Sequence, residues 1–179
     1  MLKIRQPLSY RLIRSCRKRL LKYIKLLYSE KQYLDLLNDP RIAVDDEYAE
    51  YWKTVDFKYH LAELTKKKLK NLKVLIIDQG GDHPESINRS PCYSYLNGDK
   101  NEYERYCVFK SSDQRPGTFH HKSDRYDALI NSLAKTGYDQ KKVIIVNFNN
   151  EILDGHHRAC WLWSEYGGDF QVTVLKIWA

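Results

Sequence analysis

The sequence predicts an α+β fold, in which a small mixed-sheet domain follows an N-terminal helical extension. Three observations indicate this class. From residue 72 onward, short apolar runs and amphipathic segments predict elements in the order strand, helix, strand, strand, helix, strand. The basic residues are concentrated at the N-terminus, and no run of 18 apolar residues occurs, so no membrane span is expected. We therefore expect a basic amphipathic helical extension over 1–70 and a compact domain over 71–179.

The extension begins with a helix predicted over residues 8–37. Its apolar residues recur at spacings of three and four, and Pro40 ends the segment. Residues 1–40 hold ten Lys/Arg and three Asp/Glu, a net charge of +7, whereas residues 41–179 hold twenty of each. This distribution argues against a uniformly basic nucleic-acid binder. The basic face of residues 8–29 suits an anionic membrane surface, and it suits equally well a partner or the domain itself.

A second helix is predicted over 45–70, with Lys66-Lys67-Lys68-Leu69-Lys70 as its basic C-terminus. Leu72–Ile77 then reads as a strand. Residues 78–118 are rich in Gly, Pro, Ser, Asn and Tyr, which predicts a long irregular segment that covers a site or moves. A short strand over Tyr106–Phe109 is expected to interrupt it.

The remaining elements follow from sharper patterns. A helix over 123–135 starts at a Ser123 or Asp124 cap, carries one apolar face and stops at Gly137. Two strands form a hairpin, a helix follows, and a final strand closes the domain. Their predicted ranges are Val143–Val146, Glu151–Leu153, 156–166 and Val172–Ile177.

The four cysteines show no CxxC spacing, so neither a zinc site nor a redox pair is indicated. We expect reduced, mostly structural thiols, with Cys160 buried in the last helix. This reading favours a cytoplasmic location, either free or peripheral at the inner membrane surface.

Asp154-Gly155-His156-His157-Arg158 falls where a strand ends and a helix begins. Backbone N–H groups at a helix start attract anions, and Gly155 permits close backbone approach. Arg158 can donate two parallel hydrogen bonds to phosphate oxygens. The histidines can donate hydrogen bonds or transfer protons near neutral pH. Asp154 can bind Mg²⁺ or accept a proton. As an alternative, Asp154 is an ordinary helix N-cap and the histidines are merely exposed. Adjacent histidines on a helix point in different directions, which is weak evidence for zinc.

With these residues in view, the stretch 126–178 resembles the ParB/sulfiredoxin superfamily, whose Gly-x-x-Arg helix start forms a nucleotide-phosphate site. Sulfiredoxins read Gly-Cys-His-Arg, and His156 stands here in place of their catalytic cysteine. The free-serine kinases of the superfamily read Asp-Gly-His-His-Arg, identical to residues 154–158. The resemblance implies Asp154 and His156 as catalytic residues, with Asp154 also binding the metal. It implies that Gly155, His157 and Arg158 bind phosphate.

A looser resemblance adds Arg115, in an Arg-Pro element that contacts phosphate in sulfiredoxins. The kinases also use a second acidic residue, for which Asp113, Asp124 and Asp127 are candidates, although a helix cap or a surface charge is the favoured reading of each. The pair His120-His121 is expected to be an exposed loop pair. Four residues of the long loop are candidates for selecting an acceptor: Asp82, His83, Glu85 and Arg89.

These features predict a nucleotide-dependent phosphotransferase that uses ATP or ADP with Mg²⁺. Its acceptor would be the hydroxyl of a small molecule, a sugar or a cell-envelope glycan. One alternative is a non-enzymatic ParB-like nucleotide-binding module associated with DNA, although the neutral 41–179 region makes DNA the weaker partner. Another is a non-catalytic scaffold anchored by the N-terminal helix, which would bind no nucleotide.

Overall fold

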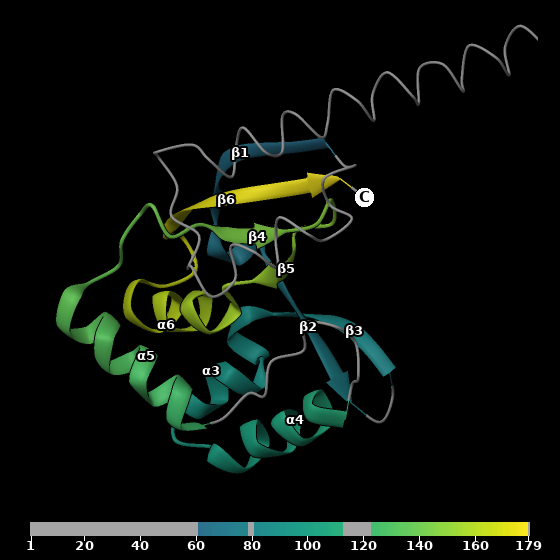
Figure 1. The fold of residues 1–179 in the computed structure, drawn as a ribbon, viewed down its shortest axis with the longest axis vertical. Helices are drawn as coiled ribbons and strands as arrows, with labels where there is room; N and C mark the ends of the chain where they lie inside the picture. Colours follow the sequence, from purple (N-terminus) through teal and green to yellow (C-terminus); the bar gives the residue numbers. More distant parts are fainter. Residues whose placement is uncertain (1–60, 79–80, 113–122, 179) are drawn as a thin grey trace, which may run out of the picture.

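The computed structural model describes residues 61–78, 81–112 and 123–178. Within them the chain forms one mixed six-stranded sheet in the order β1-β6-β4-β5-β2-β3 (Figure 1). Pairing is parallel between β6 and β4 and between β5 and β2, and antiparallel at the other three junctions. The strands are β1 (Leu61–Lys68), β2 (Lys73–Asp78), β3 (Gly81–Ser86), β4 (Ile144–Val146), β5 (Glu151–Asp154) and β6 (Gln171–Trp178). The α+β class is confirmed.

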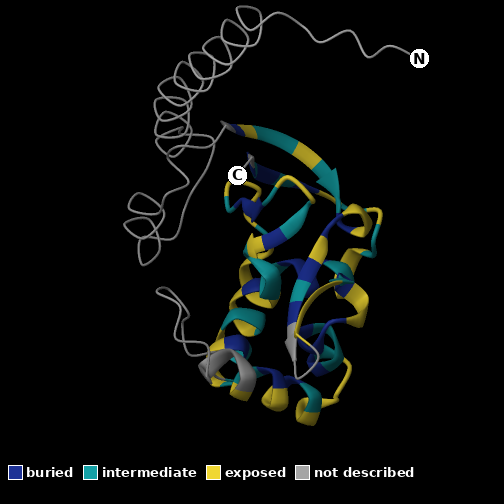
Figure 2. Cartoon of the chain, turned by 90° about the vertical axis from the view of Figure 1, so that its right-hand side faces the viewer, coloured by how far each residue is buried: buried dark blue, intermediate teal, exposed yellow. Residues whose placement is uncertain are grey.

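The α-helices of the described residues gather on one side of this sheet (Figure 1). They are α3 (Pro91–Leu96), α4 (Lys100–Ser112), α5 (Ser123–Thr136) and α6 (His156–Tyr166), and two short 3-10 turns, η2 (Leu69–Asn71) and η3 (Ile87–Arg89), complete the set. The main core lies between them and the sheet. It takes alternate residues of the strands, as the strand pleat requires, together with the buried faces of the helices (Figure 2).

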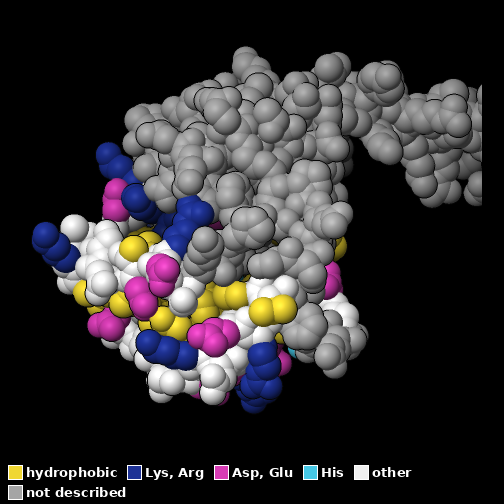
Figure 3. Space-filling model, turned by 60° about the horizontal axis from the view of Figure 1, so that its bottom comes forward, with side chains coloured by type: hydrophobic (Ala, Val, Ile, Leu, Met, Phe, Trp, Pro, Cys, Tyr) yellow, Lys and Arg dark blue, Asp and Glu magenta, His cyan; other side chains and the backbone are white. Residues whose placement is uncertain are grey.

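The opposite face of the sheet also has a buried apolar part. Ile145 pairs with Leu175 and Ala62 with Ile177, and all four side chains are almost fully buried outside the main core cluster. At the surface around the helices, acidic and basic side chains are interspersed with hydrophobic ones (Figure 3). This mixture matches the neutral charge balance of residues 41–179. In the described part of the chain, no helix has both the length and the apolarity that a membrane crossing requires.

The predicted helix over 45–70 is wrong for residues 61–68. These residues form β1, which pairs antiparallel with β6 along its whole length, from Leu61↔Trp178 to Lys68↔Gln171. Lys66, Lys67 and Lys68 therefore lie on a strand at one end of the described sheet order, and Lys70 lies in η2. Charged side chains on such a strand discourage pairing with another chain. Pairing with β6 thus overrides the local helical pattern.

The irregular segment predicted over 78–118 is also wrong where the structure describes it. Residues 81–112 form β3, η3, α3 and α4, and Tyr106–Phe109 lies inside α4 instead of in a strand. Ser90 caps α3 by accepting a hydrogen bond from the N–H of Tyr93 at 3.3 Å, and Pro91 follows it. Asp99 accepts a hydrogen bond from the N–H of Glu102 at 3.2 Å at the start of α4. These capping residues were present in the sequence as helix-start signals.

The predictions for the rest of the domain are confirmed within a residue or two. This applies to the Leu72–Ile77 strand, the 123–135 helix, the hairpin, the 156–166 helix and the final strand. Cys160 is fully buried, as expected. The predictions for 8–37 and for 45–60 lie outside the described residues.

Candidate functional site

Gly155 connects β5 to α6 in the left-handed backbone conformation, with a φ of 85°. Glycine reaches this region without the steric penalty of other residues. A Cβ atom at position 155 would lie 3.4 Å from Cγ1 of Ile144, so the turn also sits close against β4. The motif therefore occupies the predicted strand–helix junction, with a backbone shape that favours glycine.

Asp154 is the last residue of β5 and is half-buried. Its Oδ1 accepts a hydrogen bond from the N–H of Gly155 at 2.8 Å. The N-cap residue of α6 is Gly155 itself, which has no side chain with which to cap the helix. The alternative reading of Asp154 as an ordinary N-cap is therefore wrong.

The two histidines of the motif lie together instead of diverging. Their rings stack with centroids 4.4 Å apart and an interplanar angle of 23°, and both residues are half-buried. Nε2 of His156 lies 2.5 Å from the sulfur of Cys92, on α3. Nε2 of His157 lies 2.9 Å from the hydroxyl of Tyr103, on α4. Both rings thus turn from the start of α6 toward the neighbouring helices.

Cys92, His156 and His157 form a group of potential metal ligands, with one ligand atom from each within 4.8 Å of the others. The sequence prediction against zinc rested on the missing CxxC spacing and on the adjacency of the histidines. The structure does not support that argument, because the thiol comes from 64 positions earlier in the chain. Asp154, predicted as a metal ligand, is not a member of this group.

Tyrosine rings surround the histidines. The ring of Tyr126 lies 4.5 Å from that of His157, and the ring of Tyr106 lies edge-on to His156 at 5.9 Å. The Tyr126 hydroxyl donates a hydrogen bond to the carbonyl of Cys92 at 3.0 Å. Burial raises the pKa of Tyr103, Tyr106 and Tyr126 well above the usual value for tyrosine. These phenols therefore stay neutral at physiological pH and surround the histidines with groups that can form hydrogen bonds.

Arg158 is anchored to the backbone before β4. Its Nη1 donates to the carbonyls of Lys142 and Val143 at 2.9 and 3.0 Å. Tyr138 lies in the same region, where burial raises its pKa to about 12 against the opposing charge of Arg158. The guanidinium is thus held in a fixed position in the first turn of α6. Sequence reasoning predicted its place on the helix but not these carbonyl partners.

The other candidate residues are dispersed. Among the acidic candidates, Asp127 accepts a hydrogen bond from the Tyr95 hydroxyl at 2.8 Å, and Asp124 is exposed at the start of α5. Burial, followed by the bond to Asp127, raises the pKa of Tyr95 to about 12. Arg115, Asp113 and the His120-His121 pair lie outside the described residues.

The proposed acceptor-selecting residues lie on β3 and η3. Asp82, His83 and Arg89 are exposed. Glu85 accepts a hydrogen bond from the N–H of its neighbour Ser86 at 2.9 Å. None of the four is in the cysteine–histidine group.

Cys92 and Tyr103 are the site residues that sequence reasoning missed. Both come from the segment that was predicted to be irregular. The available signals were Ser90-Pro91 as the start of α3, and the spacing of three between Tyr103 and Tyr106 within α4.

Comparisons of the chain with models of known families, with curated proteins and with solved structures gave no match. The fold and the site are therefore interpreted from their own geometry.

Proposed function

We propose that this protein is a nucleotide-dependent phosphotransferase whose nucleotide phosphates bind at the start of α6. The observation that carries the proposal is the left-handed Gly155 between Asp154 and the histidine pair. It joins a strand directly to an eleven-residue helix, whose first N–H groups and dipole favour an anion. The motif Asp-Gly-His-His-Arg supports the same assignment through its resemblance to free-serine kinases.

The residues around this turn have chemically distinct tasks in the proposal. Asp154 would accept the proton of the acceptor hydroxyl. At the same time the hydroxyl oxygen would bond to the terminal phosphorus, and the bond between that phosphorus and the departing nucleotide would break. His156 would assist that proton transfer, while Gly155, His157, Arg158 and Arg115 would hold phosphate oxygens. The half-buried environment strengthens such contacts, since water screens them less. Mg²⁺ bound at Asp154 would supply charge neutralisation.

The proposed acceptor is a hydroxyl on a small molecule, a sugar or a cell-envelope glycan. The basic segment 8–29 is consistent with an acceptor at the inner surface of the membrane. A free amino acid such as serine is a further acceptor to be tested.

Calorimetry with ATP and with ADP, each with and without Mg²⁺, tests the proposal first. Asp154→Asn is then expected to lower kcat about 10²–10⁴-fold, the usual contribution of a general base, with little change in nucleotide affinity. Asp139→Asn, at an exposed loop position, is the matched control and should retain activity. Full activity in Asp154→Asn, or no nucleotide binding by the native chain, would contradict the proposal. Nucleotide binding without turnover of any acceptor would favour the ParB-like binding module.

A further inference from the structure

Cys92, His156 and His157 form a compact group, and the proposed phosphotransfer gives no role to its cysteine. The cysteine is fully buried on α3, and the two imidazoles are half-buried at the start of α6. We propose that these three side chains form a zinc-type metal site, with a fourth position for water or an anionic oxygen. The inference goes beyond the proposed function and does not depend on it, because metal binding requires neither nucleotide nor acceptor.

The donor set selects the kind of metal. One thiolate and two imidazoles are soft and borderline ligands, which favour Zn²⁺ and disfavour Mg²⁺, an ion that prefers oxygen donors. Catalytic zinc sites hold the ion with three protein ligands, and both cysteine and histidine occur among them. The site is therefore chemically separate from the magnesium role proposed for Asp154.

The distances are compatible with an ion after a small rearrangement. Zn–S bonds of about 2.3 Å and Zn–N bonds of about 2.0–2.1 Å place sulfur and nitrogen about 3.5 Å apart at tetrahedral angles. The Cys92–His156 pair lies at 2.5 Å, and the three ligand atoms lie within 4.8 Å of one another. Metal entry thus requires the sulfur and the His156 ring to separate by about 1 Å, and ligand atoms up to 4.8 Å apart to approach to about 3.5 Å.

Neighbouring tyrosines supply the outer contacts that metal ligands need. Such contacts fix the ring orientation of ligating histidines. The Tyr103 hydroxyl lies 2.9 Å from Nε2 of His157, so Nδ1 of that ring is the coordinating atom in the proposed site. The Tyr126 hydroxyl holds the backbone carbonyl of Cys92 at 3.0 Å, which fixes the start of α3. Both phenols come from helices on the same side of the sheet.

The count of ligands defines what the site can do. Three protein ligands and one exchangeable position are typical of catalytic zinc, whereas structural sites supply four protein ligands. The ion would lie at the start of α6, where the proposed function places phosphate. In the metal-bound protein, His156 and His157 would act on an anionic oxygen through the ion, and Asp154 would keep its separate role.

Titration of the full-length protein with Co²⁺, followed by displacement with Zn²⁺, tests the site without nucleotide. We expect a sulfur-to-cobalt charge-transfer band and intense visible bands of a tetrahedral ion, both removed by equimolar Zn²⁺. Cys92→Ser should abolish the charge-transfer band. Cys107→Ser is the matched control, because Cys107 is a half-buried thiol on the adjacent α4 outside the group, and it should keep the band.

Two further variants keep the test decisive if Cys92→Ser fails to fold. His156→Asn should keep a cobalt–sulfur band only at much higher Co²⁺ concentration. Tyr103→Phe should weaken Zn²⁺ binding by about 10–100-fold, the usual effect of losing an outer-shell contact. An absent charge-transfer band in the folded native protein, or a band that persists in Cys92→Ser, would overturn the proposal. Loss of kinase activity in Asp154→Asn with an intact cobalt spectrum would separate this site from the proposed phosphotransfer.

Discussion

At the scale of single residues, the motif is defined by the conformation of Gly155 as much as by its ionisable neighbours. Alanine at position 155 would have to adopt the left-handed backbone conformation, which costs about 1–2 kcal/mol. Its Cβ would also contact the Ile144 side chain at 3.4 Å. We expect Gly155→Ala to lower the free energy of unfolding by about 2 kcal/mol. Gly137→Ala is the control, because Gly137 has a φ of 75° with nothing near its Cβ position. Urea denaturation of both variants measures the difference, and equal losses would show that the Ile144 contact is unimportant.

A second residue-scale prediction concerns Gly168, where neighbouring atoms leave no room for a side chain. A Cβ atom there would lie 2.8 Å from two ring carbons of Trp163 and 3.2 Å from Cβ of Lys70. Gly168→Ala should therefore displace the indole and destabilise the protein by about 1–3 kcal/mol, the range for overpacking. The shift is measurable by tryptophan fluorescence together with thermal unfolding. Unchanged fluorescence and stability would show that this end of α6 is looser than the contacts indicate.

How far the site could be predicted also differs from residue to residue. Asp154, Gly155 and Arg158 lie where the sequence placed them, because a polar run between two apolar segments marks an element boundary. The ring stacking of His156 and His157 was not predictable in this way. It depends on Cys92 and Tyr103, which approach only after α3 and α4 pack against α6.

At the scale of elements, periodicity predicted α5, α6 and the buried strands, and it failed for the thirteen-residue α4 as well as for short or edge elements. α5 and α6 carry apolar stripes of three or more turns, whereas α3 has only six residues. In β1, Ala62 is buried and residues 63–68 are exposed or half-buried, so its apolar pattern is weak. Its strand state is determined by a partner that is remote in sequence.

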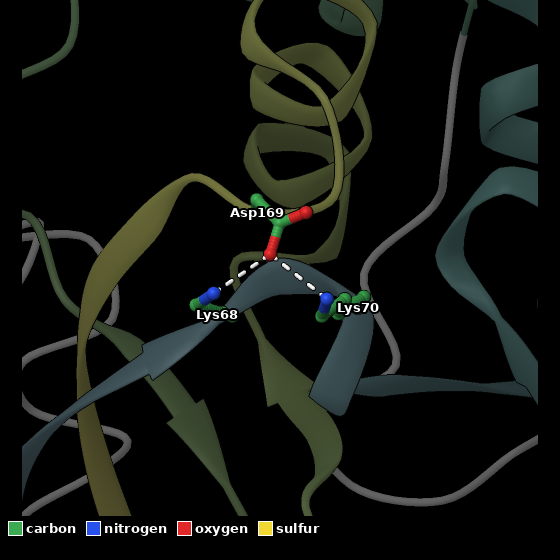
Figure 4. Close-up of polar contacts among 3 residues, drawn as sticks. All are labelled: Lys68, Lys70 and Asp169. Atoms are coloured by element: carbon green, nitrogen blue, oxygen red, sulfur yellow. Dashed lines mark hydrogen bonds and ion pairs between the residues drawn. The ribbon is translucent and has the colours of Figure 1, made fainter.

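Asp169 links the ends of β1 and β6, and it allows a test of this pairing by pH. Its Oδ1 lies 2.8 Å from Nζ of both Lys68 and Lys70 (Figure 4). Hydrogen bonds from Lys68 and then Lys70 lower the pKa of Asp169 from 3.8 to about 2. Because the folded-state pKa is depressed, the contribution to stability is complete above pH 3.8 and disappears as pH falls through about 2.

Asp169→Asn should therefore slightly destabilise the protein at neutral pH and lose that effect as the pH falls through about 2. The change should be small, since the carboxylate is exposed and solvent screens the pair. It should shrink further at about 1 M salt, where the screening length is only about 3 Å. Chemical denaturation at the two pH values and two salt concentrations provides the measurement. A difference that persists at low pH would exclude the ion pair as its cause.

At the scale of the whole molecule, the proposed metal site would join α3 to α6 across a long stretch of chain. A ligand that binds the folded state alone stabilises it by about 2.7 kcal/mol at a concentration 100 times its Kd. Zn²⁺ should then raise the Tm by about 5–10 °C for a chain of this size. Cys92→Ser should lose that increase and Cys107→Ser should keep it. A rise of equal size in both variants would indicate adventitious binding elsewhere.

The sheet order could not be predicted from the sequence. Local patterns identified strands, but nothing in them indicates that β6 inserts between β1 and β4 or that β2 pairs in parallel with β5. Such pairings depend on contacts between remote segments, so they are properties of the whole chain.

The position of β1 beside β6 has a consequence for protein synthesis. Lys68 and its partner Asp169 are 101 positions apart, and β1 has no other strand neighbour in the described sheet. In a growing chain on the ribosome, β1 therefore lacks its described partner until residues 171–178 have left the exit tunnel. Synthesis proceeds at about 5–20 residues per second, so this interval lasts several seconds. During translation, the lysines of β1 would keep an unpaired strand from associating with neighbouring nascent chains.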